Sequence, residues 1–318
     1  MTMNNRCLYC YLPLENNEKD FHEKCCVIFF GVPHAPELDL DKKKIEEMAN
    51  EMVLRSVAVT GVQPKLSLTL ETRSGDHKSS RLTIVGVMGG NFILKPPSEN
   101  HPAMPENEDL TMHLAELLEI KTGKHSLIRL QSGELAYIIK RFDRTENGKL
   151  PCEDLCQLAG ELTEHKYRGS MERVGKTIKQ STTFPMLNVL SFFEISLFSF
   201  LTGNSDMHLK NFSILKDENN NYVLAPCYDL LSTKIAVPED KEEMALTINA
   251  KKNRIERSDF DMFGKTLGLT DKQKEDVFFR FSRQKEKLLE FISIGFLSDD
   301  LKQQYTDLVK ENAEKLKL

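Results

Sequence analysis

The sequence lacks the long apolar run and the leader that would place it in or across a membrane. Its longest apolar stretch, residues 186–201, is interrupted by Asn188, Glu194 and several serines, so it predicts a buried amphipathic helix rather than a membrane span. No basic segment followed by an apolar core opens the chain, so we expect no signal peptide. We therefore expect a cytoplasmic location, in the producing cell or in a host cell if the protein is secreted.

A basic surplus is also missing. The 318 residues include 43 Lys and Arg against 48 Asp and Glu, a formal net charge of -5. Proteins that grip the phosphate backbone normally carry a positive excess, so we expect no direct nucleic-acid binding. The sequence has no internal repeat and no low-complexity segment, and its 40% hydrophobic content is typical of a globular chain with one large domain or two lobes.

The segment between the first two expected strands is neither a Walker sequence nor the three-glycine loop of common protein kinases. Instead, Thr60-Gly61-Val62-Gln63-Pro64-Lys65 joins two expected strands. The glycine permits a close backbone approach, and neighbouring amides can face an anion, although Pro64 removes one donor. We predict that Gly61, Gln63 and Lys65 contact nucleotide phosphates. The alternative is an ordinary hairpin turn with a surface lysine.

Seven cysteines are present, an odd number, and four of them lie within the first 26 residues. Without a secretory signal, this crowding favours a metal site over a disulfide framework. Cys7-x-x-Cys10 and, after an eleven-residue gap, His22-x-x-Cys25 supply four ligands that suit a structural tetrahedral Zn²⁺. Cys26 could replace Cys25. The alternative is a set of small buried cysteines in a reducing cytosol.

Periodicity predicts a strand-rich first half and a helical second half. The expected helices cover 42–54 and 107–120, with further helices between 272 and 318; the expected strands cover 57–60, 66–70, 81–87 and 91–94 (read as a hairpin), 127–130, 135–139, 212–215 and 222–225. This order predicts an α+β, two-lobed protein-kinase-like fold with a short zinc-knuckle-like head. We place the head at 1–31, a small N-lobe at 32–140 and a helical C-lobe at 141–318, with the cleft near residue 140.

The run from Gly203 to Asn211 places a carboxylate, a lysine and an amide on one short loop after a long helix, and Asp229 follows a later strand. This layout is typical of phosphoryl transfer: Asp206 orients the nucleophile, Lys210 steadies the phosphoryl group, and Asn211 and Asp229 hold Mg²⁺. The alternatives are polar residues that only satisfy a turn, and an Asp229 that caps a helix.

Lys95 ends the apolar strand 92–94 and is expected to bind the α- and β-phosphates of ATP. Glu108 could pair with it, but an exposed acid at a helix start fits the sequence at least as well, so Glu108 is left out of the predicted site. After the strand 137–139, Lys140 and Phe142 are candidates for contacts with the nucleotide, Phe142 with its adenine. A salt-linked strand end is the alternative there.

With these residues in hand, the chain resembles the HipA family of bacterial toxin Ser/Thr kinases over roughly residues 55–235. Seven motifs in the same order carry the resemblance: Thr60-Gly-Val-Gln-Pro-Lys65, Ile93-Leu-Lys-Pro96, Arg141-Phe-Asp-Arg144, Leu150-Pro-Cys-Glu-Asp-Leu-Cys-Gln157, Lys166-Tyr167, Asn204-Ser-Asp-Met-His-Leu-Lys-Asn211 and Ala225-Pro-Cys-Tyr-Asp-Leu-Leu-Ser-Thr233.

The resemblance implies an ATP- and Mg²⁺-dependent kinase with Asp206 as the catalytic aspartate and Lys95 as the ATP lysine. It also implies a protein substrate, an aminoacyl-tRNA synthetase whose phosphorylation blocks translation, and a DNA-binding antitoxin as partner. Two other readings of the sequence stay open. One is a catalytically silent nucleotide-binding module that sequesters a partner protein, and the other is a kinase for a small molecule.

The chain departs from the family pattern in two places. The family autophosphorylates a serine in the glycine loop, but Ala58 stands at that position, which leaves Thr60 and Ser56 as the autophosphorylation candidates. The chain also resembles the compact, HipT-like members that lack an extra N-terminal subdomain, with the cysteine-rich head in its place.

Overall fold

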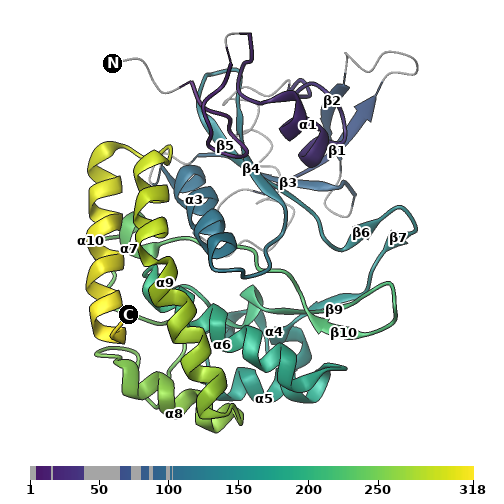
Figure 1. Cartoon of the computed structure of the whole chain (residues 1–318). Coiled ribbons are helices and arrows are strands. Elements are labelled where there is room, and N and C mark those ends of the chain that lie inside the picture. The colour runs from purple at the N-terminus through teal and green to yellow at the C-terminus, as the bar shows by residue number, and fades with distance from the viewer. Residues whose placement is uncertain are drawn as a thin grey trace. The chain divides into compact units, whose positions relative to one another are not determined.

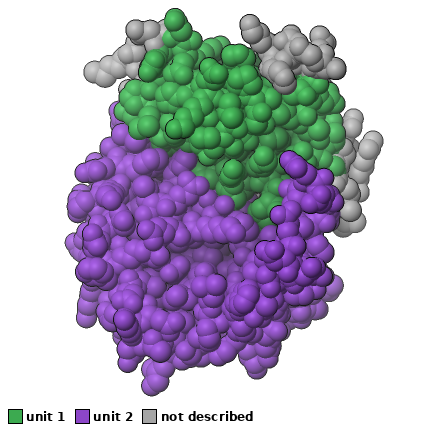
Figure 2. Space-filling view, turned by 45° about the vertical axis from the view of Figure 1, so that its right-hand side comes forward, with its two compact units in different colours: residues 1–109, 123–142 green, residues 110–122, 143–318 purple. Residues whose placement is uncertain are grey.

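The computed structural model describes residues 5–15, 17–38, 65–72, 80–85, 89–97, 101 and 103–318. The chain divides into two compact units, coloured separately in Figure 2. Unit 1 comprises residues 1–109 and 123–142, and unit 2 comprises 110–122 and 143–318. The helix expected at 42–54 and the strand expected at 57–60 lie outside the described residues.

Unit 1 is built on a five-stranded antiparallel sheet. Its strands are β1 (Leu66–Thr72), β2 (Ser80–Ile84), β3 (Phe92–Lys95), β4 (His125–Arg129) and β5 (Leu135–Lys140), in the spatial order β2-β1-β3-β5-β4. The hairpin expected from 81–87 and 91–94 is therefore wrong, because β1 lies between β2 and β3. Gly90, with φ +80°, lets the chain approach β1 closely just before β3 begins: a Cβ there would lie 2.6 Å from the Leu68 carbonyl oxygen.

The two faces of this sheet differ in chemistry. Cross-strand partners share a face, and the pairs Leu68↔Phe92 and Leu94↔Ile138 define an apolar one. Helix α1 (Glu23–Phe30) covers it, with the rings of Phe29 and Phe30 centred 5.7 and 6.0 Å from that of Phe92.

The opposite face carries polar residues and meets the beginning of helix α3 (Met104–Leu117). Lys95, His125 and Tyr137 lie on this face by the strand register. Helix α3 begins three residues before the predicted start at 107, because Pro105 is tolerated in a first helical turn.

Unit 2 is mainly helical (Figure 1). Its longer helices are α5 (Met171–Ser181), α6 (Pro185–Leu201), α8 (Arg257–Leu267), α9 (Asp271–Ile294) and α10 (Asp299–Leu316), and the short ones are α4 (Leu155–Leu158) and α7 (Thr233–Ala236). Helix α6 is buried over most of its length, which confirms the buried helix expected at 186–201. Ring contacts with α8 and α9 surround its Phe193.

A small sheet of order β10-β9-β8 accompanies these helices. Strands β9 (Ser213–Lys216) and β10 (Tyr222–Leu224) correspond to the strands predicted at 212–215 and 222–225. They pair as a hairpin, and Asp217 accepts the backbone amides of Asn219 and Asn221 in its turn. Strand β8 (Cys152–Asp154) was not expected, because three residues carry no periodicity of their own. Strands β6 (Arg144–Thr145) and β7 (Gly148–Lys149) form a separate two-stranded hairpin.

The architecture is the predicted α+β class, with a strand-rich unit and a helical unit. Within the described part of the chain, no helix combines the length and the apolar character needed to cross a membrane. The head packs within unit 1, as the contacts of Phe29 and Phe30 show. The domain boundaries placed after residues 31 and 140 stay a prediction.

We predict that Phe193→Ala lowers the free energy of unfolding by about 3–5 kcal/mol, because its fully buried ring packs against Phe260, Phe263 and Phe278. The measurement is urea unfolding followed by far-UV circular dichroism. Phe279→Ala is the matched control, since this ring is 63% exposed, and should cost at most about 1 kcal/mol. Equal losses in the two variants would contradict this description of the core.

Candidate functional site

The acidic loop, residues 203–211 of unit 2, follows the end of α6. Two amide side chains bind its backbone. Asn204 Oδ1 accepts the amide of Asp206 at 3.1 Å, and Asn211 Nδ2 donates to the Asp206 carbonyl oxygen at 3.1 Å. Gly203 has φ +66°, and a Cβ there would lie 2.8 Å from a Leu308 side-chain carbon, so the turn needs glycine. The loop's own turn is thus satisfied by asparagines, and the Asp206 carboxylate is left for another partner.

That partner is Tyr167, which the sequence analysis placed in a family motif without giving it a role. Its hydroxyl donates to Asp206 Oδ1 at 2.5 Å. Burial raises the pKa of Tyr167, and the hydrogen bond and the charge of Asp206 raise it further, so the phenol stays protonated. Asp206 is therefore held by a donor from a segment 39 residues away while remaining partly accessible.

Lys210 is held by a residue of the unexpected strand β8. Its Nζ lies 3.1 Å from Asp154 Oδ2, and the Lys210 side chain is 35% exposed. Tyr228 donates to the Lys210 carbonyl oxygen at 2.9 Å and lies 2.6 Å from the Ser213 hydroxyl. Asp154 also caps α4 through the Gln157 amide, so one carboxylate connects β8, α4 and the acidic loop.

Asp229 lies in the left-handed region, with φ +55°. A non-glycine residue there is unusual, and such conformations gather at functional sites. The helix that follows is α7, whose N-cap position is Ser232. Asp229 therefore does not cap a helix at 229–233, and that alternative is excluded.

His208 is buried within the loop, with 5% of its surface exposed. Burial lowers its pKa, with Lys166 acting in the same direction, so the ring is neutral at pH 7. Its ring packs against the Tyr167 ring in a T-shaped arrangement, with centroids 5.0 Å apart. This packing supports a structural role for His208.

In unit 1, Lys95 and Glu108 form a buried ion pair of 2.5 Å between β3 and α3. Their side chains are 5% and 1% exposed, and Lys95 also lies 5.3 Å from the centre of the Tyr137 ring. The reading of Glu108 as an exposed acid at a helix start is therefore wrong. The helix start is packed against the sheet, so the acid is not exposed there.

Of the other nucleotide contacts predicted in unit 1, Lys140 lies on a different face of the sheet from Lys95. The register pairs Lys140 with Phe92 and Tyr137 with Lys95, which puts the two lysines on opposite faces of the sheet. Lys140 is therefore removed from the nucleotide site as a correction. Phe142 follows β5 and is half-buried, and Lys65 is exposed just before β1. Gly61, Gln63, Thr60 and Ser56 lie outside the described residues.

The head gathers the four predicted metal ligands: one ligand atom from each of Cys7, Cys10, His22 and Cys25 lies within 4.8 Å of the others. Cys26 lies outside this group of four, although it is buried, so the structure selects Cys25 over Cys26. Burial raises the pKa of Cys7, but backbone hydrogen bonds outweigh this and lower it overall. Burial and the nearby Cys7 charge raise that of Cys25.

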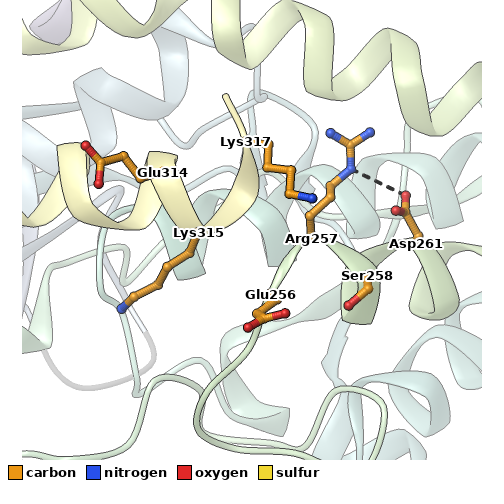
Figure 3. A pocket seen from close by; sticks show the side chains of 7 residues that line it. All are labelled: Glu256, Arg257, Ser258, Asp261, Glu314, Lys315 and Lys317. Atoms are coloured by element: carbon orange, nitrogen blue, oxygen red, sulfur yellow. Dashed lines mark hydrogen bonds and ion pairs between the residues drawn. The ribbon is translucent and has the colours of Figure 1, made fainter.

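A pocket of about 370 Å³ in unit 2 holds none of these residues. Figure 3 shows its lining, in which Arg257 Nε lies 3.4 Å from Asp261 Oδ1 while Glu314 and Lys315 point away from that pair. Its charges are largely matched within the unit, since Arg257 also pairs with Glu275, and Lys315 with Glu243. We assign it no role in phosphoryl transfer.

The comparisons with known proteins decide the family. The model of the HipA-like C-terminal domain matches residues 57–288, well over half of the chain. The chain belongs to this family. The HipA resemblance read from the seven motifs is confirmed.

Relatives of this HipA-like chain are named as kinases. "Putative kinase Y4dM" of Sinorhizobium fredii is 35% identical over 61% of the chain and 49% of its own length. A "Putative kinase" of Haemophilus influenzae is 27% identical over 76% of the chain and 77% of its own. The serine/threonine-protein kinase toxin HipA of Shewanella oneidensis is 27% identical over 61% and 47%. The chain thus spans about half the length of the first and third.

Two solved structures support the kinase-like fold. The Shewanella oneidensis HipA toxin, in complex with HipB and operator DNA, matches with a TM-score of 0.68 and 23% identity over 81% of this chain and 64% of that one. The Helicobacter pylori proinflammatory kinase CtkA matches with a TM-score of 0.53 and 19% identity over 74% and 90%. Both likenesses confirm the predicted fold class.

We predict that Lys95→Met and Glu108→Leu each lower the free energy of unfolding by about 3–5 kcal/mol, because each leaves a buried charge without its partner. The double variant should lose less than either single one, since no unpaired charge remains. Urea unfolding of all four proteins gives the coupling.

The more exposed pair Lys252–Glu242 is the matched control. Lys252→Met and Glu242→Leu should each cost under about 1 kcal/mol. Additive losses at Lys95 and Glu108 would show that the buried contact is not the source of their effect.

Proposed function

We propose that this HipA-like chain is an ATP- and Mg²⁺-dependent Ser/Thr protein kinase. The observation that carries the proposal is the buried Lys95–Glu108 pair. In protein kinases a lysine at this strand position must be joined to a helix glutamate for phosphoryl transfer. The kinase names of the relatives and the kinase-like fold support the same chemistry.

Asp206 is the proposed catalytic residue. Its carboxylate accepts or orients the proton of the substrate hydroxyl, and the Tyr167 hydroxyl keeps it in place. Lys210 offers a positive charge on the same loop to the phosphoryl group. Its pair with Asp154 fixes its position and lowers its freedom to move away.

The residues present fit a magnesium ion. Asn211 uses its amide nitrogen within the loop, which leaves its Oδ1 as a neutral oxygen ligand, and Asp229 supplies a carboxylate. Oxygen ligands of this kind are those that Mg²⁺ prefers. When bound, MgATP supplies the phosphoryl group and neutralises part of its charge.

The remaining nucleotide contacts are assigned to Lys95, which binds the α- and β-phosphates, to Lys65 with Gly61 and Gln63 of its loop, and to Phe142 at the adenine. Thr60 and Ser56 are the sites at which the chain would phosphorylate itself. Zn²⁺ in the Cys/His head has a structural role, because four protein ligands leave no open position for chemistry.

The biological assignment follows the relatives. The Shewanella oneidensis relative is a kinase toxin, and its structure contains HipB and operator DNA. We therefore propose a toxin–antitoxin role, with a DNA-binding antitoxin as partner and an aminoacyl-tRNA synthetase as the protein substrate whose phosphorylation stops translation. We propose a cytoplasmic site of action, without direct nucleic-acid binding by this chain.

We predict that Asp206→Asn slows phosphoryl transfer by about 10²–10⁴-fold, because the amide cannot take up a proton. Asp229→Asn should lower transfer as severely by weakening the magnesium site. The measurement is transfer of label from γ-labelled ATP, with Mg²⁺ and a cell lysate, to proteins identified by mass spectrometry. Asp300→Asn, an exposed acid at the start of α10, is the matched control and should behave as the wild type.

A labelled lysate protein that depends on Asp206 names the substrate. Label on the chain alone locates the autophosphorylation site. Label on a small molecule supports a kinase that phosphorylates small molecules instead of proteins. Nucleotide binding without any transfer would support the silent module that sequesters a partner. Full activity of Asp206→Asn would overturn the assignment of the catalytic residue.

A further inference from the structure

The Cys/His head has the geometry of a filled tetrahedral site. Zn²⁺ bound by sulfur at about 2.3 Å and nitrogen at about 2.0–2.1 Å in a tetrahedron requires sulfur and nitrogen ligands about 3.5–3.6 Å apart. His22 Nδ1 lies 3.4 Å from Cys10 Sγ and 3.6 Å from Cys25 Sγ. The spacing of the donors therefore matches the edges of a zinc tetrahedron.

The orientation of His22 selects its metal-binding nitrogen. Its Nε2 lies 3.0 Å from the carbonyl oxygen of Pro13, which accepts hydrogen bonds only, so Nε2 carries the proton. In the neutral ring the lone pair is then on Nδ1, which faces Cys10 and Cys25. A backbone carbonyl that fixes the other ring nitrogen is the usual second shell of a metal-ligating histidine.

The head also contacts β4, the strand at one edge of the sheet. The carbonyl oxygen of Leu8, between the two first cysteines, accepts the Leu127 amide at 3.2 Å and the Ser126 hydroxyl at 3.1 Å. Asp20, in the segment leading to His22, pairs with Arg129 at 2.8 Å. The metal ligands therefore lie on two segments that both attach to β4.

From this edge, Tyr11 reaches the beginning of α3. Tyr11 directly follows Cys10, is fully buried, and has φ +63°, a conformation that a tyrosine rarely adopts. Its hydroxyl donates to Asp109 Oδ2 at 2.7 Å, and Asp109 Oδ1 lies 2.7 Å from His125 Nδ1. Asp109 is the neighbour of Glu108, which pairs with Lys95.

We infer that Cys7, Cys10, His22 and Cys25 bind one structural Zn²⁺, and that the loaded head acts through Tyr11 and Asp109 as a brace for the Lys95–Glu108 pair. The bound metal fixes the conformation of the Cys7–Cys10 segment and so the position of Tyr11. The Tyr11 hydrogen bond to Asp109 then stabilises the helical turn that carries Glu108. Tyr11 and Asp109 are positioning residues. The bracing half of this inference rests on the proposed role of Lys95 in binding ATP.

The first test is the metal content of the full-length chain. We expect about one zinc per chain by plasma mass spectrometry, and the visible absorption of tetrahedral cobalt–thiolate after exchange with Co²⁺. His22→Ala should lose the metal and His22→Cys should keep it, since a fourth thiolate is an equivalent ligand. Cys25→Ala should lose it, whereas the matched control Cys26→Ala, at the adjacent buried cysteine, should keep it.

The second test is hydrogen exchange of α3 and β4, read by mass spectrometry. Removing zinc with a chelator, or Tyr11→Phe with zinc still bound, should speed exchange in the first turns of α3 about tenfold, as loss of a hydrogen bond to a charged group does. The KM for ATP should rise in the same variant while the zinc content is unchanged.

The outcomes separate the claims. A chain that takes up neither Zn²⁺ nor Co²⁺, or a Cys26→Ala variant that loses metal while Cys25→Ala keeps it, overturns the metal site. Unchanged exchange in zinc-loaded Tyr11→Phe overturns the brace. Normal metal content and exchange in a chain that binds no nucleotide overturn the kinase proposal, and with it the ATP role of the brace, while the metal site stands.

Discussion

Lys95 and Glu108 place opposite charges together in the interior of unit 1, at 2.5 Å and with almost no exposure to water. Burying either charge alone costs several kcal/mol, and their attraction offsets this only while the geometry is kept. The surrounding structure keeps it: β3 ends at the lysine, α3 begins just before the glutamate, and Tyr137 packs beside the ammonium. The pair therefore fixes where helix and sheet meet.

The acidic loop of unit 2 follows a different principle, since its charges stay partly accessible and its backbone is held by neutral side chains. Asn204 and Asn211 bind the backbone of Asp206, and Tyr167 binds its carboxylate. A rigid loop with an accessible acid suits catalysis by positioning, because little ordering is left to be done when a substrate binds. The left-handed Asp229 adds a second preorganised carboxylate.

The sequence predicted those elements that carry their own pattern. The apolar strand before Lys95, the buried helix α6 and the β9–β10 hairpin all appear where local periodicity and turn residues placed them. The fold class followed from the order of the expected strands and helices, and the family followed from the order of the motifs. Cys25, rather than Cys26, entered the metal group as first expected.

The misses share one cause, which is that long-range packing decides them. Strand β8 exists because β9 pairs with it, and the expected hairpin failed because β1 inserted between its strands. Glu108 looked like a surface acid, but the start of α3 packs against the sheet and buries it beside Lys95. Lys140 was placed at the nucleotide because it follows the strand 137–139, where one lobe was expected to pass into the next, whereas its face of the sheet is set by pairing with Phe92. Tyr167 and Asp154 belonged to recognised motifs, but only the folded chain shows which charged groups they hold.

The most direct test of the central claim is a crystal structure of the chain with a non-hydrolysable ATP analogue and Mn²⁺, whose anomalous signal locates the metal independently of the nucleotide. The account predicts a Mn²⁺ peak bound by Asn211 Oδ1 and the Asp229 carboxylate, with the nucleotide's phosphates on the Lys95 ammonium. A peak bound by other side chains, with Asn211, Asp229 and Lys95 all free of the nucleotide and the metal, would contradict it.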